Sequence, residues 1–526
     1  MKSYLFIAVP ALCLLCACNK GVQFESEEAY LPESYQNGHE MMVLGNRLND
    51  PYSLEYVNAA VNKLYPATKA GREGVQPTDL YVRMLPADQD EFDALDGMGV
   101  TMMDHPFDYE ILRDGDYYHD PSVEEGDITW QYAVVSPDFK FPPWLEYEVL
   151  DSCFISEHAQ QTKALEGVDW AAVEREAFVL SGNGAMLEGL TKGGSVAPQG
   201  RISIMDDEYS DEPIGVSGVT VVANVFVKVA NAVTDEEGYY RMSTTFGTEV
   251  RYRLMFKNVK GCAIGLNLIL VPASLSALGK GDPSGIDITV DRDSEGKLFS
   301  RCVVNNACYD YYEKCREDGE KMDTPPANLR IWIFQNLRQS LPVMLQQGAL
   351  VDNSMLSDYL GSYLFILKMF LPDIILGLNG RDDYGSIYAE TLHQLAHTSH
   401  YALVGNTFWD HLLKYDIRTF ITSGGTTYGA GTETDHGYCE VAEMWAYYLQ
   451  TMMYNDRYPD AQLTFGTNYW FCPQILLYLD ERGMNRFLLF KAFTSDVVDR
   501  DMLYKRLCSL YPDMEDIIEQ AFMRYL

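Results

Sequence analysis

The chain has 526 residues, with 76 acidic against 40 basic side chains and a formal net charge of −36 at pH 7. This negative charge excludes a nucleic-acid-binding protein, because affinity for nucleic acid depends largely on Lys and Arg side chains that neutralise phosphates. Hydrophobic residues make up 47% and aromatic residues 13% of the chain, which excludes a mainly disordered acidic protein. The length predicts roughly three to four domains of about 150 residues each.

The N-terminal segment predicts an exported protein. Lys2 precedes an apolar stretch of 14 residues, from Tyr4 to Ala17. This stretch is shorter than the roughly 20 residues that a membrane-spanning helix needs. We therefore expect residues 1–17 to be a signal peptide that is removed from the mature chain.

The end of this segment, Leu15-Cys16-Ala17-Cys18, resembles the bacterial lipobox. The resemblance implies cleavage before Cys18 and acylation of that cysteine, with palmitate-type chains that anchor the protein to a membrane. We expect an outer-membrane location, on the periplasmic or cell-surface side, with residues 18–40 as a polar tether. An ordinary secretory signal that is cut after Ala17 is the alternative.

Eight cysteines follow Cys18. Export to an oxidising compartment permits disulfides, but the sequence does not select among the pairings. No Cys-x-x-Cys pair occurs in the mature part, so a thiolate zinc site is not expected.

Residues 41–165 predict a mixed α+β domain. Apolar residues at helical spacing follow Ser53, whose residue type commonly caps helices. The expected elements are helices Ser53–Leu64 and Asp88–Leu95 and strands Thr78–Leu85, Ile128–Val135 and Leu145–Leu150. The stretch from Asp104 to Asp120 is rich in acidic side chains and predicts a solvated acidic surface.

Residues 166–197 combine a short helical pattern, Trp170–Val179, with a Gly/Ser-rich run, and predict a linker. From Pro198 the pattern changes to short alternating segments that are typical of a small β-sandwich. The expected strands are Gly200–Ile204, Val216–Ala223 and Arg251–Phe256, and Thr234–Met242 is expected to form an acidic turn followed by an aromatic strand.

Two motifs in this region resemble the carboxypeptidase regulatory-like (transthyretin-like) domain. They are the strand Gly218-Val219-Thr220-Val221 and the turn Thr234-Asp235-Glu236-Glu237-Gly238-Tyr239. The resemblance implies a β-sandwich over residues 198–260. It says little about function, since such modules usually serve as spacers or packing partners.

Histidines are concentrated in the last third of the chain. A predicted strand, Asp373–Leu378, is followed by a turn and by a helix from about Asp383 that contains His393 and His397. Side chains four residues apart project from one face of a helix, so both imidazoles can bind the same metal ion. A second helix is predicted at Gly437–Tyr448.

This strand, turn and His-x-x-x-His helix resembles the zincin metallopeptidases, whose signature is His-Glu-x-x-His. The second helix is similar to that of the gluzincin branch, in which a Glu before an aromatic residue is the third zinc ligand. The resemblance implies Zn²⁺ as the cofactor and His393, His397 and Glu443 as its ligands, with Glu440 as the alternative third ligand. It also implies a zincin-like domain over residues 261–526. Helical patterns predict its C-terminal lobe at Pro473–Leu479, Met484–Thr494, Asp501–Leu510 and Met514–Leu526.

The sequence departs from the family at the general base. The family's catalytic Glu, which takes a proton from zinc-bound water, falls on Gln394. An amide cannot act as that base, and loss of a general base typically costs on the order of 10²–10⁴ in rate. Glu390 lies about one helical turn away and is a poor geometric substitute.

Three further residues near the predicted site have two interpretations each. His436 and Tyr438 precede or begin the second helix, where they can stabilise an oxyanion as in active relatives or serve only in capping and packing. His400 lies about 10 Å along the helix axis from His393, at about 1.5 Å per residue, which is too far for one shared ion. We expect His400 to be a structural or substrate-side residue.

The sequence thus predicts an α+β multidomain protein with an N-terminal mixed α+β domain, a central small β-sandwich and a C-terminal, mainly helical zincin-like domain. The expected function is that of a lipid-anchored exported protein that binds zinc but has weak or no peptidase activity. The alternative is a non-catalytic surface lipoprotein that binds peptide, glycoprotein or glycan. The expected partners are a protein, peptide or glycoprotein and, through the N-terminal lipid, the membrane, but not nucleic acid.

Overall fold

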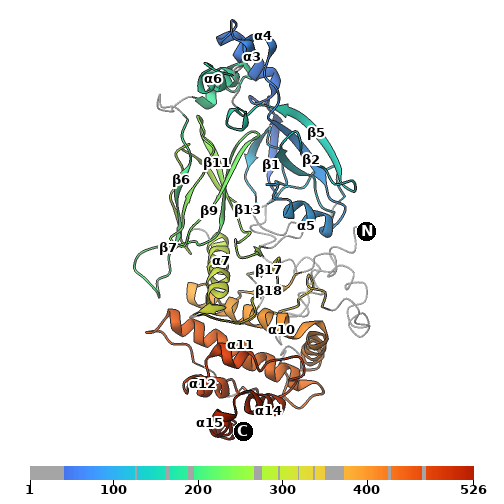
Figure 1. The fold of residues 1–526 in the computed structure, drawn as a ribbon, viewed down its shortest axis with the longest axis vertical. Coiled ribbons are helices and arrows are strands. Elements are labelled where there is room, and N and C mark those ends of the chain that lie inside the picture. The colour runs from blue at the N-terminus through green and yellow to red at the C-terminus, as the bar shows by residue number, and fades with distance from the viewer. Residues whose placement is uncertain are drawn as a thin grey trace, which may run out of the picture.

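The computed structural model describes residues 41–526 except for positions 116, 125–126, 161–164, 188–194, 266–274, 294–295, 318, 336–337, 350–371, 424–427, 465–468 and 526. The predicted signal peptide, the tether and Cys18 lie outside the described residues. The protein is a mixed α and β chain with several sheets and a helical C-terminal region (Figure 1). Within the described part of the chain, no helix has both the length and the apolarity needed to cross a membrane.

The N-terminal region is built on small antiparallel sheets. Strand β2 (Asp79–Leu85) lies between β4 (Gln131–Val135) and β5 (Glu146–Cys153), and β1 (Val43–Arg47) pairs with β3 (Tyr109–Arg113). The predicted strands and the two predicted helices of this region are confirmed, the helices as α3 (Leu54–Leu64) and α5 (Gln89–Gly97). Asp88 caps α5 through the backbone N–H of Glu91, whereas the side chain of Ser53 makes no such bond to α3.

The prediction of a solvated surface between Asp104 and Asp120 is wrong for its first part. Asp104, His105 and Asp108 are all buried. Each carboxylate has partners: Asp104 contacts His105 Nδ1 at 2.8 Å, and Asp108 forms an ion pair with Arg47 at 2.6 Å. Burial is tolerated because these charges are paired and hydrogen-bonded.

A small helical cluster covers one end of the N-terminal region. Helix α6 (Trp170–Leu180) packs against α3, and α4 (Lys69–Glu73) lies beside them. The cluster shares its own apolar core, formed by Val57, Ala60, Val61, Ala70, Val75, Phe154, Val173 and Ala177. Part of the segment expected as a linker therefore takes part in packing. Short 3₁₀ turns follow β5 and α6, at Ser156–His158 and Gly184–Leu187.

Two four-stranded sheets occupy the middle of the molecule (Figure 1). One sheet contains β10 (Tyr239–Arg241), β6 (Gln199–Ile204), β14 (Ile288–Val290) and β7 (Ile214–Gly215), and the other contains β13 (Leu275–Gly281), β11 (Val250–Met255), β8 (Thr220–Val225) and β9 (Lys228–Val233). Buried residues of both sheets belong to one hydrophobic cluster. The strands continue beyond residue 260, since β13 pairs with β11 and β14 pairs in parallel with β6.

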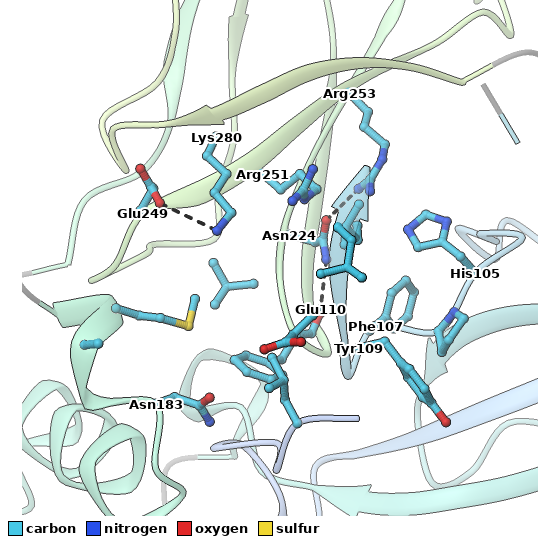
Figure 2. Close-up of a pocket in the computed structure, with 18 of the residues that line it drawn as sticks. His105, Phe107, Tyr109, Glu110, Asn183, Asn224, Glu249, Arg251, Arg253 and Lys280 are labelled. Atoms are coloured by element: carbon cyan, nitrogen blue, oxygen red, sulfur yellow. Dashed lines mark hydrogen bonds and ion pairs between the residues drawn. The ribbon is translucent and has the colours of Figure 1, made fainter. Parts of the chain in front are cut away.

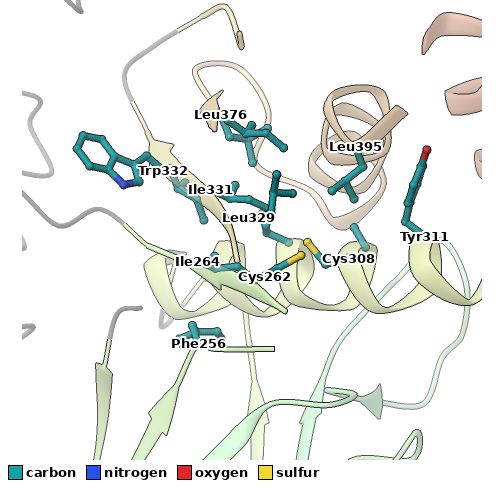
Figure 3. Close-up of a cluster of buried hydrophobic side chains, with 14 of the residues drawn as sticks. Phe256, Cys262, Ile264, Cys308, Tyr311, Leu329, Ile331, Trp332, Leu376 and Leu395 are labelled. Carbon is teal, nitrogen blue, oxygen red and sulfur yellow. The ribbon is translucent and has the colours of Figure 1, made fainter. Parts of the chain in front are cut away.

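A parallel three-stranded sheet connects the strand-rich part to the helical part. Its strands are β12 (Cys262–Ile264), β17 (Leu329–Phe334) and β18 (Ile374–Gly377), and helix α7 (Gly296–Lys314) packs against α10. Their apolar side chains meet in the core shown in Figure 3, where Cys262 and Cys308 face each other. The short pair β15 (Arg316–Glu317) and β16 (Glu320–Lys321) follows α7. All eight described cysteines are free.

The C-terminal region is helical, as predicted. Its elements are α10 (Tyr384–Ser423), α11 (His436–Arg457), α12 (Gln474–Asp480), α13 (Arg486–Phe490), α14 (Arg500–Leu510), the 3₁₀ turn Pro512–Met514 and α15 (Glu515–Arg524). Helix α10 consists of two helices joined across a kink at Gly405, whose φ of 74° and ψ of −177° are non-helical. Helices α10 and α11 pack closely along each other, and this packing positions the candidate site.

Candidate metal centre

The first helix of the site starts directly after the parallel sheet. Strand β18 ends at Gly377, and Asp383 then caps α10, because its carboxylate accepts a hydrogen bond of 2.7 Å from the backbone N–H of Ser386. Leu392, Leu395 and Ala396 are fully buried and fix the helix in the core. This packing leaves His393 and His397 on one face, one turn apart, as the sequence predicts.

The second helix brings a carboxylate to the two imidazoles. The Nε2 atoms of His393 and His397 lie 3.1 Å apart. One oxygen of Glu443 on α11 lies 3.4 Å from His393 Nε2, and the other lies 3.3 Å from His397 Nε2. All three side chains are buried. We call His393, His397 and Glu443 the triad.

The triad has the donor set and the spacing of a metal site. Two imidazoles and one carboxylate are the protein ligands of one common type of catalytic zinc site, in which a fourth position stays open. Ligand atoms bound at about 2.0–2.2 Å to a tetrahedral ion lie about 3.3–3.6 Å from one another. The three distances of 3.1, 3.3 and 3.4 Å are close to that range. A buried group of these residues can therefore hold a metal ion.

The electrostatics of the triad favour an ionised carboxylate. Burial acts to raise the pKa of Glu443, but the imidazoles of His397 and His393 outweigh it and lower the pKa to about 2. Burial is the largest single influence on His393 and acts to lower its pKa, but the hydrogen bond and charge of Glu443, together with Glu390 and Gln450, outweigh burial, and the pKa is raised. For His397 burial dominates, and the pKa is lowered. An anionic Glu443 beside at least one neutral imidazole is the ionisation state that binds a cation.

A second residue of α11 orients one of the histidines. The side-chain oxygen of Gln450 lies 3.3 Å from Nδ1 of His393. An N–H at Nδ1 that donates to this oxygen leaves the Nε2 lone pair free for a metal, which is the usual outer-shell arrangement of metal-binding histidines. The Nδ1 atom of His397 has no hydrogen-bond partner among the described residues.

The structure places an amide next to the triad where the resemblance implies a general base. Gln394 is buried, and its side-chain oxygen has no hydrogen-bond partner in the described part of the chain. Glu390, one turn earlier, forms an ion pair of 2.7 Å with Arg381. The Glu390 carboxylate is therefore held in an ion pair with Arg381, which argues against a role for Glu390 as the general base in place of Gln394.

The other residues that the sequence suggested have partners outside the triad. Glu440 accepts a hydrogen bond of 3.0 Å from the backbone N–H of Arg500 and contacts its guanidinium at 3.2 Å. His436 Nδ1 lies 2.9 Å from the carbonyl oxygen of Glu433, at the start of α11. Tyr438 stacks on His411 with ring centroids 4.6 Å apart.

His400 is a core residue. Its side chain is fully buried among the rings of Phe408, Trp409 and Phe493. Burial lowers its pKa to about 3. From the sequence, His400 was expected to be either a structural or a substrate-side residue. A neutral imidazole enclosed by aromatic rings fits the structural role.

Three polar residues near the triad were not predicted from the sequence. The ring of Tyr447 contacts that of His393 edge to face at 4.5 Å, and its hydroxyl lies 3.2 Å from that of Tyr428. Asp416 is buried, and burial together with the charge of Glu443 raises its pKa well above the usual range. Tyr447 follows Glu443 by one helical turn, so the sequence offered a signal for it. Tyr428 and Asp416 come from other segments and offered none.

Comparisons with protein-family models, with curated proteins and with solved structures found no match to this chain.

Proposed function

We propose that the triad binds a zinc ion in a metallopeptidase-like domain, and that this domain has weak or no peptidase activity. The observation that carries the proposal is the convergence of three buried metal-ligating side chains from two helices, with ligand atoms within 4.8 Å of one another. Burial of a carboxylate and two imidazoles at this spacing destabilises the folded protein unless a cation or a proton satisfies them.

The residues around the triad decide what chemistry is available. A zinc ion supplies a Lewis acid that polarises a carbonyl group and acidifies water. Gln394 can orient a polar group by hydrogen bonding, but it cannot accept a proton. The hydroxyls of Tyr428 and Tyr447 can donate to a carbonyl oxygen of a bound peptide. These side chains support binding and polarisation of a peptide better than its hydrolysis.

The amide at Gln394 also favours a second candidate function. In this alternative the protein is a non-catalytic surface lipoprotein, and the metal centre stabilises a domain that binds peptide, glycoprotein or glycan. The lipobox-like sequence at Cys18 supports membrane anchoring in both cases, and the high negative charge argues against nucleic acid as a partner. Incorporation of labelled palmitate, lost in Cys18→Ala, would test the anchor.

A cleavage assay separates the two functions. The zinc-loaded protein, Gln394→Glu and the double variant Gln394→Glu/His393→Ala are each incubated with a broad peptide library. We expect little or no cleavage by the wild type and at least about 10²-fold more by Gln394→Glu, because the carboxylate restores a general base. The double variant controls for contaminating proteases and should be inactive. Absence of cleavage by a zinc-loaded, folded Gln394→Glu would favour the non-catalytic binding protein.

A further inference from the structure

A second candidate site lies in a pocket of about 530 Å³ between the N-terminal region and the sheet of β8, β11 and β13 (Figure 2). The segment before and along β3 forms one wall, the turn after α6 forms a second, and the strands supply charged side chains from a third. None of its lining residues belongs to α10 or α11, so the pocket is separate from the triad. Its volume is typical of sites for small molecules.

The feature that points to a ligand is the buried cation Arg253. Its side chain is only 2% exposed, and it lines the pocket. Nη1 donates to the side-chain oxygen of Asn224 at 3.0 Å, whereas Nη2 has no hydrogen-bond partner within the described residues. Burial and then the charge of Arg251 lower the pKa of Arg253 to about 10, which leaves it a cation at neutral pH. A buried charge without a counter-ion is strongly unfavourable.

The carboxylates around Arg253 are already engaged elsewhere. Asp114 forms two bonds of 2.6 and 2.7 Å with Arg251. Asp104 contacts His105 at 2.8 Å and also accepts from the backbone N–H of Tyr118 at 2.6 Å. By contrast, the equally buried Lys228 has two carboxylate partners, Glu157 at 2.8 Å and Glu174 at 3.3 Å. Arg253 thus lacks the pairing that this fold gives to another buried cation.

The rest of the lining narrows the class of ligand. Lys280 lies at the limit of an ion pair with Glu249, 4.0 Å away, and Glu110 adds a second carboxylate to the pocket. Two carboxylates disfavour a multiply charged anion such as phosphate, but they accept hydrogen bonds from hydroxyl groups. Phe107 and Phe226 offer aromatic surface to the apolar face of a ring. The lining therefore suits a ligand with one carboxylate and several hydroxyls.

We infer that this pocket binds an acidic sugar, with its carboxylate on the guanidinium of Arg253 and its hydroxyls on the polar side chains of the opposite wall. Arginine recognises a carboxylate through two parallel N–H bonds, and Nη2 is available for one of them. This site is independent of the triad and does not require metal at His393, His397 and Glu443.

Titration calorimetry on the full-length mature protein tests the inference, with glucuronate, N-acetylneuraminate, glucose, inorganic phosphate and triglycine as probes. We expect at least one of the two acidic sugars to bind and glucose to bind at least about tenfold more weakly, because the charge-assisted bonds to Arg253 are lost. Binding of phosphate or triglycine in preference to both acidic sugars would overturn the assignment, as would the absence of binding by either acidic sugar.

Variants locate the binding. Arg253→Gln should weaken binding of the acidic sugar by at least about tenfold. It should also raise the melting temperature of the free protein, because it removes an uncompensated buried charge. Lys280→Gln changes a more exposed side chain, with little risk to folding, and should weaken binding by about threefold. Arg482→Gln, an exposed change in the C-terminal region, is the matched control and should leave affinity unchanged. Unchanged affinity in both Arg253→Gln and Lys280→Gln would contradict the proposed site.

Discussion

The Nε2 atoms of His393 and His397 lie 3.1 Å apart, and the carboxylate of Glu443 contacts both from a neighbouring helix. A single metal ion bound between these atoms would satisfy all three groups at once. The packing of α10 against α11 therefore buries apolar surface and also sets the spacing of three side chains that can hold a metal ion.

Gln450 should tune metal affinity through His393. Its side-chain oxygen lies 3.3 Å from Nδ1 of that histidine. Loss of such an outer-shell partner typically weakens metal binding by about 10–100-fold, and we expect this for Gln450→Leu. Gln450→Glu, which supplies a carboxylate acceptor, is the matched control and should bind at least as tightly as the wild type. Competition with a zinc chelator measures the zinc affinity of both variants. Equal zinc affinities of Gln450→Leu and the wild type would show that Gln450 does not orient His393.

His400 should make the protein sensitive to acid. Burial lowers its pKa to about 3, so below the ordinary pKa the unfolded state binds a proton that the folded state excludes. Stability is therefore fully present above about pH 6.5 and falls as the pH drops toward 3, by about 2 kcal/mol between pH 6.5 and pH 5. Urea unfolding at several pH values should show a flatter profile for His400→Leu than for the wild type. Parallel profiles would mean that His400 does not titrate in this way.

Asp206 should stabilise the end of α11 from a distant part of the chain. Its buried carboxylate accepts hydrogen bonds of 2.9 Å from both Arg457 and the hydroxyl of Tyr458. Asp206→Asn leaves a largely buried guanidinium with Asp310, at 3.4 Å, as its remaining carboxylate partner. We expect a loss of about 3 kcal/mol in the free energy of unfolding. The exposed neighbour provides the control: Asp207→Asn should change stability by less than about 0.5 kcal/mol, and equal losses in both variants would refute the pairing.

The sequence allowed prediction of the elements whose pattern is local. The helix with His393 and His397 was predicted from its start near Asp383, its apolar face and its regular spacing, and all three features are present in the structure. Strand β9 was missed, because the turn that joins it to β8 consists of Phe226 and Val227, and Phe226 adopts a φ of 48° without a turn-type residue. Such a turn is stabilised by burial in the surrounding core, which no short window of sequence reveals.

Long-range packing explains the other differences. Helix α7 has buried residues around most of its surface, including Arg301, Asn305 and Asn306, so it lacks the single apolar face that identifies a helix in sequence. The acidic residues Asp104 and Asp108 were predicted to lie on a solvated surface, because their partners Tyr118, Arg47 and Tyr81 are distant in sequence and meet them only in the fold. The same limit applies to Tyr428 and Asp416 beside the triad.

Metal analysis of the purified mature protein shows most directly whether the triad binds zinc. The protein is stripped with a chelator, exposed to excess zinc, desalted and measured by mass spectrometry for metal content. We predict about one tightly held zinc per chain in the wild type. We predict the same for Glu440→Gln, because the carboxylate of Glu440 contacts Arg500 and not the triad. Glu443→Gln and His397→Ala should retain far less. Absence of zinc in the folded wild type, or undiminished zinc in Glu443→Gln, would show that the triad is not a zinc site.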